Sequence, residues 1–319
     1  MGERQPSPTQ TILHLPAGSV DWAGVLTQFT LLLAAREGRA YATWASERLL
    51  RFSRKGEGIV ALSDGKLLGL LLLELQDHSI EFSFPWTCEP DVMLAGEIAT
   101  TAIAVGRALY PEARYLRMER QLLPGQADPV GLETAGACCR WRNRMMLELA
   151  NWHDSPHIAA GYRVVPWNIR DLEAAAAVVY RANINTLDAV LYAPFFGESP
   201  AQCRKGLLSI LSGTYGPLHP QATICAFHDS TLVGINLVIH EGTGLASIVE
   251  LSVDPAHQRQ GLGRALMMRT LQILKADHIE RVELAVTQEN ARAVNLYASL
   301  GFLEYGEFPV CVWPLERRD

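Results

Sequence analysis

The residues with the clearest chemical potential lie where an apolar run ends and a helical pattern begins. Ala246 to Val253 alternates as a strand, and the apolar stripe that starts near Gly263 predicts a helix. Backbone N–H groups at the start of a helix have no partner inside the helix, and the helix dipole gives them positive potential. Gly261 and Gly263 have no side chain to obstruct an approaching anion. We therefore predict that Arg259 to Arg264 binds a diphosphate, with Arg259 and Arg264 either adding charge or being ordinary surface residues.

The glycine pattern is not that of the dinucleotide-binding fingerprint or of the P-loop. The fingerprint needs a third glycine, and position 266 is Leu. What remains is Gln258-x-x-Gly261-x-Gly263, and it is followed by a second pattern that runs from Asn290 through Tyr297 to Phe302.

These two patterns together resemble the GNAT (GCN5-related N-acetyltransferase) superfamily. The first matches its Q/R-x-x-G-x-G/A signature, and the second matches N-x-x-A-x-x-L-Y-x-x-x-G-F at Asn290, Ala293, Leu296, Tyr297, Gly301 and Phe302. The resemblance extends roughly from Tyr162 to the C-terminus, and the stretch VDPAHQRQGLGRAL is especially similar to ribosomal-protein alanine N-acetyltransferases. It implies a cofactor, acetyl-CoA or another acyl-CoA.

The resemblance also implies which residues bind that cofactor. Backbone groups of a splayed strand hold the pantetheine arm, the glycine loop holds the pyrophosphate, and an asparagine contacts the arm. In this sequence these are Leu251, Ser252, Val253, Gln258, Arg259, Gln260, Gly261, Leu262, Gly263, Arg264 and Asn290.

Acetyl transfer to an amine needs a proton acceptor and benefits from a proton donor for the departing thiolate. By the resemblance, Tyr297 lies near the thioester sulfur; a phenol with a pKa near 10 keeps its proton at neutral pH. The ribosomal-protein enzymes have a glutamate base where this chain has Ala285. Glu250 is the expected replacement, directly or through a water, and Glu283 is the alternative because it shares a strand face with Ala285. Glu250 could instead be a solvated or substrate-orienting carboxylate.

The elements that position these residues occur twice. At an offset of 165 residues, Ile59, Ala61, Asp64, Leu67 and Gly69 fall on identical residues at Ile224, Ala226, Asp229, Leu232 and Gly234. In both copies two apolar runs flank a short polar turn, which is typical of a β-hairpin. We therefore predict a duplicated α+β fold, with two tandem GNAT-like domains, each a mixed, mostly antiparallel sheet flanked by helices.

The offset also predicts that the first copy is catalytically silent. It places Gln258 on Met93, Gly263 on Ile98, Glu250 on Pro85 and Tyr297 on Leu132, while Gly96 matches Gly261. We predict a degenerate, non-catalytic domain over residues 1–155 and an acetyltransferase domain over 156–319, joined by the linker Ala150 to Gly161. The layout is similar to that of mycothiol synthases.

The acceptor is expected to be a primary amine of a small molecule or a peptide N-terminus. An aromatic insert with Tyr192, Phe195 and Phe196 predicts an acceptor pocket, or equally a helix packing patch. The leading hypothesis is direct transfer in a ternary complex by an N-acetyltransferase. The alternatives are a non-catalytic acyl-CoA sensor and a protein-docking module.

Composition excludes several other classes. The net charge is −6 and the 28 Lys and Arg are dispersed, which argues against a nucleic-acid partner. The longest apolar run, Leu67 to Leu73, is shorter than the roughly 20 residues of a membrane span, so no membrane partner is expected. The six cysteines show no metal-ligand spacing, so no metal is expected, and we predict reduced thiols in a cytoplasmic protein.

Overall fold

The computed structural model describes residues 10–76, 79–120, 132–133, 136–150, 152–153, 158–196 and 199–314, and these fall into two compact units. The first unit contains Met1–Cys139 and Pro309–Asp319, and the second contains Arg140–Phe308. Much of the expected linker, and the expected boundary at residues 155 and 156, lies outside the described residues.

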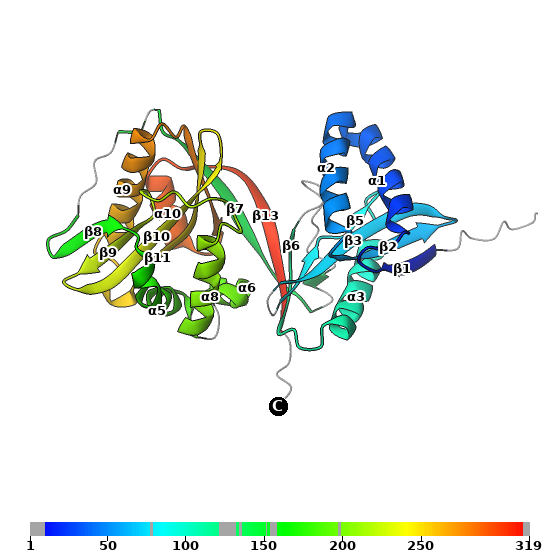
Figure 1. Ribbon diagram of the computed structural model, residues 1–319, viewed down its shortest axis with the longest axis horizontal. Coiled ribbons are helices and arrows are strands. Elements are labelled where there is room, and N and C mark those ends of the chain that lie inside the picture. Colours follow the sequence, from blue (N-terminus) through cyan, green and yellow to red (C-terminus); the bar gives the residue numbers. More distant parts are fainter. Residues whose placement is uncertain are drawn as a thin grey trace, which may run out of the picture. The chain divides into compact units, whose positions relative to one another are not determined.

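The first unit has a sheet with helices on both faces (Figure 1). Helices α1 and α2 pack on one face through Phe29 and Leu49, and α3 packs on the other through Ile98 and Ala102. Its elements are β1 (Gln10–Leu15), α1 (Trp22–Glu37), α2 (Arg39–Phe52), β2 (Glu57–Ser63), β3 (Lys66–Gln76), β4 (Ser79–Ser83), β5 (Trp86–Thr87), α3 (Val92–Leu109) and β6 (Tyr115–Arg120).

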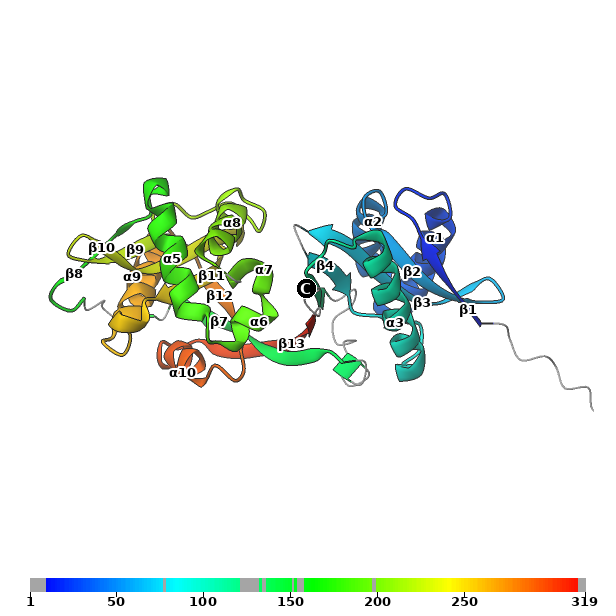
Figure 2. The same ribbon diagram turned by 90° about the horizontal axis from the view of Figure 1, so that it is seen from below.

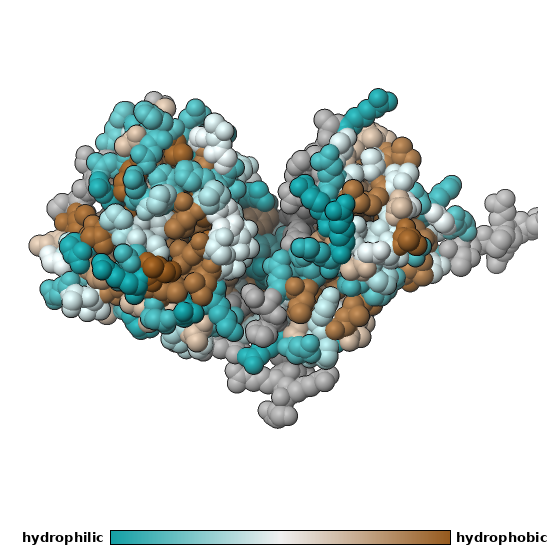
Figure 3. Space-filling model, viewed as in Figure 1, coloured by the Kyte–Doolittle hydropathy of each residue, from teal (hydrophilic) through white to brown (hydrophobic). Residues whose placement is uncertain are grey.

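Helix α3 is long and apolar enough to cross a membrane by length and composition alone. Its inner face, with Leu94, Ile98 and Ala102, packs in the core of the first unit, as the face of a core helix does. On the side seen in Figure 3, apolar residues form several small patches separated by polar ones.

The second unit has the same layered plan (Figure 2). Helices α5 and α8 pack on one face of its sheet, and α9 and α10 pack on the other. Its elements are β7 (Cys138–Glu148), β8 (Tyr162–Pro166), η1 (Ile169–Asp171), α5 (Leu172–Asn183), α6 (Leu187–Leu191), α7 (Ala193–Phe196), α8 (Pro200–Leu211), β9 (Ile224–His228), β10 (Thr231–Gly242), β11 (Leu245–Val253), η2 (Pro255–His257), α9 (Leu262–Ala276), β12 (Arg281–Thr287), α10 (Ala291–Ser299) and β13 (Leu303–Pro314).

The duplication extends to backbone geometry. The offset found in the sequence places the hairpin β2–β3 on β9–β10, and the turn residues Asp64 and Asp229 both have positive φ, at 49° and 52°. It also places β7 on β13, each preceded by a glycine with positive φ, Gly136 at 87° and Gly301 at 94°. Two copies of one chain pattern therefore fold into two similar units.

The last strands of the two copies are exchanged. β7 follows β6 in the chain but pairs with β12 of the second unit, from Arg281↔Glu148 to Thr287↔Arg142. The last part of β13 follows the second copy but pairs with β6 of the first unit, from Cys311↔Met118 to Pro314↔Tyr115. β12 of the second unit thus pairs with the strand that ends the first copy, and β6 of the first unit pairs with the strand that ends the second copy.

Because of this exchange, the compact units have other bounds than the expected domains. The chain enters the second unit at Arg140, before the expected linker, and returns to the first unit at Pro309. The sequence repeat did not predict these pairings. β7 and β13 are equivalent strands, and a sequence offset does not determine which neighbouring strand each one pairs with.

The expectation of reduced cysteines is also corrected. Cys139 and Cys311 form a disulfide within the first unit, and Cys88, Cys138, Cys203 and Cys225 are free. The two bridged residues are 172 positions apart, and only the exchange of β13 brings them together.

Candidate active site

An opening in the sheet of the second unit lies between β11 and β12. These parallel strands pair from Leu245↔Arg281 to Ile248↔Leu284, and their register ends there although both strands continue. β12 remains paired with β7 on its other side to Thr287. The ends of β11 and β12 therefore diverge, leaving backbone groups of β11 without a strand partner on that edge.

The amide and carbonyl groups of Leu251 and Val253 face this opening. The Asp254 amide donates to the Val233 carbonyl at 2.8 Å, on the β10 side. Along an antiparallel strand, only every second residue bonds to a given neighbouring strand. The amide and carbonyl groups of Leu251 and Val253 therefore point away from β10, towards the opening. The Val253 carbonyl there accepts a bond from Gln258 Nε2 at 2.9 Å.

A β-bulge directs Glu250 to the face covered by α5 and α8. Leu237 pairs with Glu250, whereas the next residue, Val238, pairs with Ile248, so Val249 is the extra residue. Residues opposite one another in a ladder share a face, and Leu237 belongs to the core cluster under α5 and α8. Without the bulge, Glu250 would point to the α9 face.

Glu250 is a buried carboxylate with an unusual titration. It is 7% exposed, and its Oε1 accepts a hydrogen bond from Ser252 Oγ at 2.5 Å. Asn183 Nδ2 in turn lies 3.2 Å from Ser252 Oγ. Burial raises the pKa of Glu250 from 4.5 to about 7; the Ser252 bond lowers it, the charge of Asp188 raises it and that of Arg142 lowers it. A carboxyl with this pKa exchanges protons near neutral pH.

Tyr297 lies on α10 and is 8% exposed. Asn290 begins this helix, because its side-chain oxygen accepts from the Ala293 amide at 3.2 Å. Burial raises the pKa of the Tyr297 hydroxyl above its ordinary value, and the charge of Glu250 raises it further. The two groups thus lie within electrostatic range, and the hydroxyl stays protonated at neutral pH.

The glycine loop has the backbone shape of an anion site. Gly261 is the residue before α9 and has a left-handed conformation with φ 78°, and Arg259 also has positive φ, at 59°. No side chain caps the helix, and a Cβ at Gly261 would meet open space. The N–H groups at the start of α9 are therefore accessible to an anion.

Side chains fix this loop from several directions. Gln258 Oε1 accepts from Arg292 Nη1, and Arg264 Nη1 donates to Ser299 Oγ at 2.8 Å. The Tyr162 hydroxyl donates to Gln260 Oε1 at 2.8 Å. The side chains of Gln258, Gln260 and Arg264, three of the residues expected to bind the cofactor, thus hold the loop in shape. Arg259 is exposed.

The opening and the loop together fit acetyl-CoA. The free edge of β11 presents the donors and acceptors that an extended amide-containing arm requires. The uncapped start of α9 presents N–H groups to a diphosphate. Among the described residues, no group of His, Cys, Asp and Glu could hold a metal ion.

The residues expected on the acceptor side differ in role. Phe195 packs closely against Gly206 of α8, and both Phe195 and Phe196 border the core under that helix, which favours the packing explanation for these two. Tyr192 instead lies under the guanidinium of Arg142, with 4.7 Å from Cζ to the ring centre. Glu283, the alternative base, accepts a hydrogen bond from Tyr305 at 2.8 Å.

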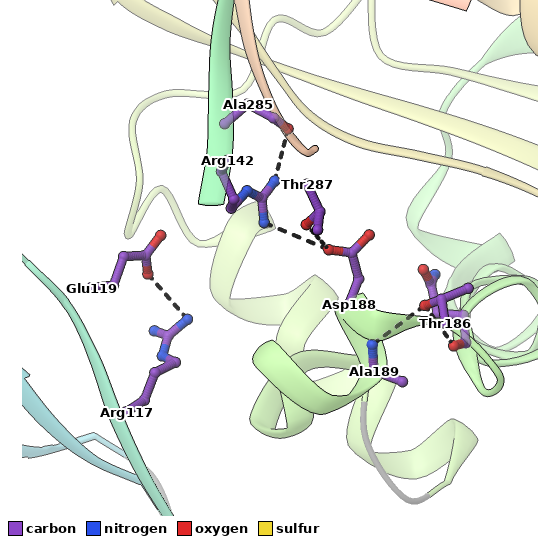
Figure 4. A network of polar contacts seen from close by, with 9 residues as sticks. Arg117, Glu119, Arg142, Thr186, Asp188, Ala189, Ala285 and Thr287 are labelled. Atoms are coloured by element: carbon purple, nitrogen blue, oxygen red, sulfur yellow. Dashed lines mark hydrogen bonds and ion pairs between the residues drawn. The ribbon is translucent and has the colours of Figure 1, made fainter. Parts of the chain in front are cut away.

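A polar cluster beside the catalytic candidates was not foreseen from the sequence. It joins Asp188 of α6, Arg142 of β7 and Thr287 of β12 (Figure 4). Thr287 Oγ1 donates to Asp188 Oδ1 at 2.6 Å, and Arg142 Nη2 donates to the Ala285 carbonyl at 2.7 Å. The alternation of Arg140, Arg142 and Arg144 in the sequence was the available signal for a charged strand face.

In the described part of the first unit, the position equivalent to the glycine loop has a different structure. The offset places the start of α9, Leu262, on Glu97, which lies inside α3, so Gly96 is a residue of the helix interior. α3 is capped by Asp91, whose Oδ1 accepts from the Leu94 amide at 2.9 Å. An N-terminal carboxylate occupies a donor that a phosphate would need and repels the phosphate as well.

Comparison with known proteins agrees with this geometry. Residues 195–302 match the acetyltransferase (GNAT) family model. The second unit contains a GNAT acetyltransferase domain. The matched part of this domain holds the β11 opening, the glycine loop, Glu250 and Tyr297, whereas Asp188 and Arg142 lie outside it.

Curated relatives match this chain over short segments. A mycothiol acetyltransferase of Kineococcus radiotolerans is 51% identical over 59 residues, which is 18% of this chain and 19% of that protein. The ribosomal protein bS18-alanine N-acetyltransferase of Escherichia coli is 44% identical over 59 residues, 18% of this chain and 40% of that protein. The matched segment thus spans from a fifth to two fifths of these relatives.

Solved structures show that the whole chain has a GNAT fold. A GCN5-related N-acetyltransferase from Sphaerobacter thermophilus has a TM-score of 0.64 at 14% identity, covering 94% of this chain and 95% of that one. A tandem GNAT protein from the clavulanic acid biosynthesis pathway has a TM-score of 0.54 at 18% identity, covering 98% of this chain and 100% of that one. The α+β tandem architecture expected from the sequence is confirmed.

Proposed function

We propose that this protein is an acetyl-CoA-dependent N-acetyltransferase whose active site lies in the GNAT domain of the second unit. The observation that carries the proposal is the coincidence, in one unit, of an open strand edge, an uncapped helix start and a buried carboxyl with a pKa of about 7. The family match over residues 195–302 supports the same conclusion.

Acetyl-CoA supplies the acetyl thioester when it is bound. Leu251 and Val253 would hold its arm through their backbone groups, and Arg259 to Arg264 would hold its diphosphate through the N–H groups at the start of α9. Glu250 takes the proton that the acceptor ammonium must lose before its nitrogen attacks. Tyr297 holds a proton at its hydroxyl, and the departing sulfur needs one.

Direct attack of the amine on the thioester agrees with the raised pKa of the Cys203 thiol. Cys203 is buried, and its pKa is raised to about 12 by burial and by the charge of Glu250. A thiol with such a pKa is not a nucleophile at neutral pH. Cys203 is therefore not expected to form an acetyl-enzyme intermediate.

The proposed acceptor is a primary amine on a small molecule or at a peptide N-terminus. The mycothiol and ribosomal-protein acetyltransferases named above each match this chain over only 59 residues, too short a segment to carry over their acceptors. The cluster of Arg142, Asp188 and Tyr192 beside Glu250 gives the acceptor side both charges and an aromatic ring.

Two measurements test this function. Acetyl-CoA should raise the melting temperature, because a ligand that binds only the folded state stabilises it. Release of CoA thiol should then identify the acceptor in a screen of amines, polyamines, aminoglycosides, cysteinyl compounds and peptides. No shift at millimolar acetyl-CoA would refute the cofactor site, and a shift with no thiol release from any amine would favour an acyl-CoA sensor.

A further inference from the structure

Arg142 belongs, by its place in the repeat, to the first copy. The offset places its strand β7 on β13, which ends the second copy. Yet β7 completes the sheet of the second unit, and Arg142 pairs there with Thr287 at the end of β12. Asn143 and Met145 are buried, so the alternation along β7 turns Arg142 to the opposite face of the sheet from them.

The Arg142 guanidinium contacts three elements of the second unit. Its Nη2 donates to the Ala285 carbonyl of β12 at 2.7 Å, and its Nη1 lies 3.8 Å from Asp188 Oδ1 of α6. Its Cζ lies over the Tyr192 ring that follows α6. The side chains of Arg142 and Asp188 are 15% and 18% exposed, so the pair is shielded from solvent and only weakly screened.

Asp188 is held from two further directions. Thr287 Oγ1 donates to it, and Thr186 begins its helix by accepting from the Ala189 amide at 3.3 Å. The Thr186 hydroxyl also donates to the Asn183 carbonyl at 2.8 Å, at the end of α5. Asn183 is the residue that lies behind Ser252 and Glu250. These contacts, together with the backbone from Asn183 to Ala189, connect Arg142 to the proposed base.

Arg142 and Asp188 act electrostatically on both catalytic candidates. The charge of Arg142 lowers the pKa of Glu250 and of Tyr297, and the charge of Asp188 raises both. Three further electrostatic interactions involve these candidates. The charge of Glu250 raises the pKa of Tyr297, the charge of Arg292 lowers it, and the charge of Glu250 raises the pKa of Cys203.

We propose that Arg142, supplied by the exchanged strand β7, is a positioning residue of the transfer site: it fixes Asp188 and α6 against β12 and sets the charge around Glu250. The first copy, which its sequence predicts to be catalytically silent, thereby contributes a residue to the active site of the second. This inference rests on the proposed function.

Full-length Arg142→Gln, Arg142→Lys and Arg144→Gln test it. Arg144 is the matched control, because it lies on the same strand and the same face but is exposed and contacts the Phe308 ring. In Arg142→Gln the acid limb of the kcat/KM profile should move to higher pH by about one unit, as expected when a nearby opposite charge is lost. Arg142→Lys keeps the positive charge, so its profile should lie close to that of the wild type. Arg144→Gln should leave the profile unchanged.

Asp188→Asn provides the opposite test if Arg142→Gln does not fold. Loss of the negative charge should move the acid limb to lower pH. A wild-type profile in both Arg142→Gln and Asp188→Asn, or an equal shift in Arg144→Gln, would overturn the proposal. A lowered melting temperature with an unchanged pH profile would do so too, because it would show a purely structural role.

A titration of Glu250 by carbon NMR separates this inference from the proposed function. The carboxyl signals of glutamate-labelled protein can be followed with pH, and the Glu250→Gln variant assigns the relevant signal. If no amine is acetylated but Arg142→Gln still raises the Glu250 pKa, the function fails and the electrostatic role of Arg142 stands. If transfer occurs and the pKa does not move, the function stands and the role of Arg142 fails.

Discussion

The hydroxyl of Ser252 donates to the Glu250 carboxylate at 2.5 Å, two residues away on the same strand face. Neighbours two residues apart share a face only while the strand is regular, and the bulge at Val249 ends just before this pair. The bulge therefore brings the carboxylate to the α5 side, and Ser252 stabilises its ionised form there.

Glu250→Gln should lower kcat/KM by about 100-fold or more, because the amide cannot accept the acceptor's proton. The melting-temperature shift with acetyl-CoA should be kept. Glu283→Gln is the matched control: its carboxylate is bonded to Tyr305, and we expect nearly wild-type rates. Steady-state kinetics of both variants check this, and a large loss in Glu283→Gln alone would assign the base to Glu283.

The stability of the second unit should depend on pH through Glu250. Its pKa is raised in the folded state, so the folded protein holds this proton more tightly than the unfolded chain does. The resulting stabilisation is complete below pH 4.5 and is lost as the pH rises to about 7, a total of about 3 kcal/mol. The Glu250→Gln variant has no titrating carboxyl at this position, so it should not lose this stability as the pH rises.

Denaturant unfolding of wild type and Glu250→Gln at pH 5 and pH 8 measures this effect. The variant should gain stability relative to wild type on going to pH 8. An identical difference at both pH values would show that Glu250 is not titrating in this range.

Tyr297→Phe should lower turnover by about 100-fold, since the proton for the departing sulfur is lost. Phe has nearly the same volume, so no cavity forms beside Leu300 and Phe302 in this core, and the melting temperature should change little. Acetyl-CoA binding by calorimetry should be unaffected. Unchanged turnover would reduce Tyr297 to a packing residue.

Gly261→Ala should weaken acetyl-CoA binding. Its φ of 78° is costly for any residue with a Cβ, by about 1–2 kcal/mol, and the added methyl enters the open space at the start of α9. Gly96→Ala is the matched control in the first unit, where it lies inside α3 with open space around it.

The control should gain about 0.5–1 kcal/mol of stability from helix propensity and keep the full acetyl-CoA shift. Thermal unfolding with and without acetyl-CoA compares the two variants. Loss of the shift in Gly96→Ala would mean that the first unit binds the cofactor after all.

The Cys139–Cys311 disulfide should leave Cys88, Cys138, Cys203 and Cys225 as the free thiols of the denatured, non-reduced protein. Cys311→Ser should destabilise the first unit by about 2–5 kcal/mol, because the bridge closes a very long loop in the unfolded chain. Thiol titration and unfolding in the presence of a reductant check both points. Six reactive thiols in freshly purified protein would contradict the bridge.

The sequence by itself determined the features that depend on neighbouring residues. Gln258 to Gly263 and the Asn290 to Phe302 pattern predicted the turn before α9 and the start of α10, because a strand, a turn and a helix start are local in the chain. The offset that aligns Asp64 with Asp229 identified two copies of one fold for the same reason. It also predicts a first copy without the site, a prediction that the cap of α3 by Asp91 supports.

Only the tertiary structure decided the partners of β7 and β13. Both strands have the apolar alternation of a sheet strand, and either could pair with β6 or β12; the choice depends on contacts between residues far apart in the chain. That choice joined Cys139 to Cys311 and placed Arg142 beside Asp188 and Glu250. Patterns with a period of a few residues carry no information about such long-range pairings.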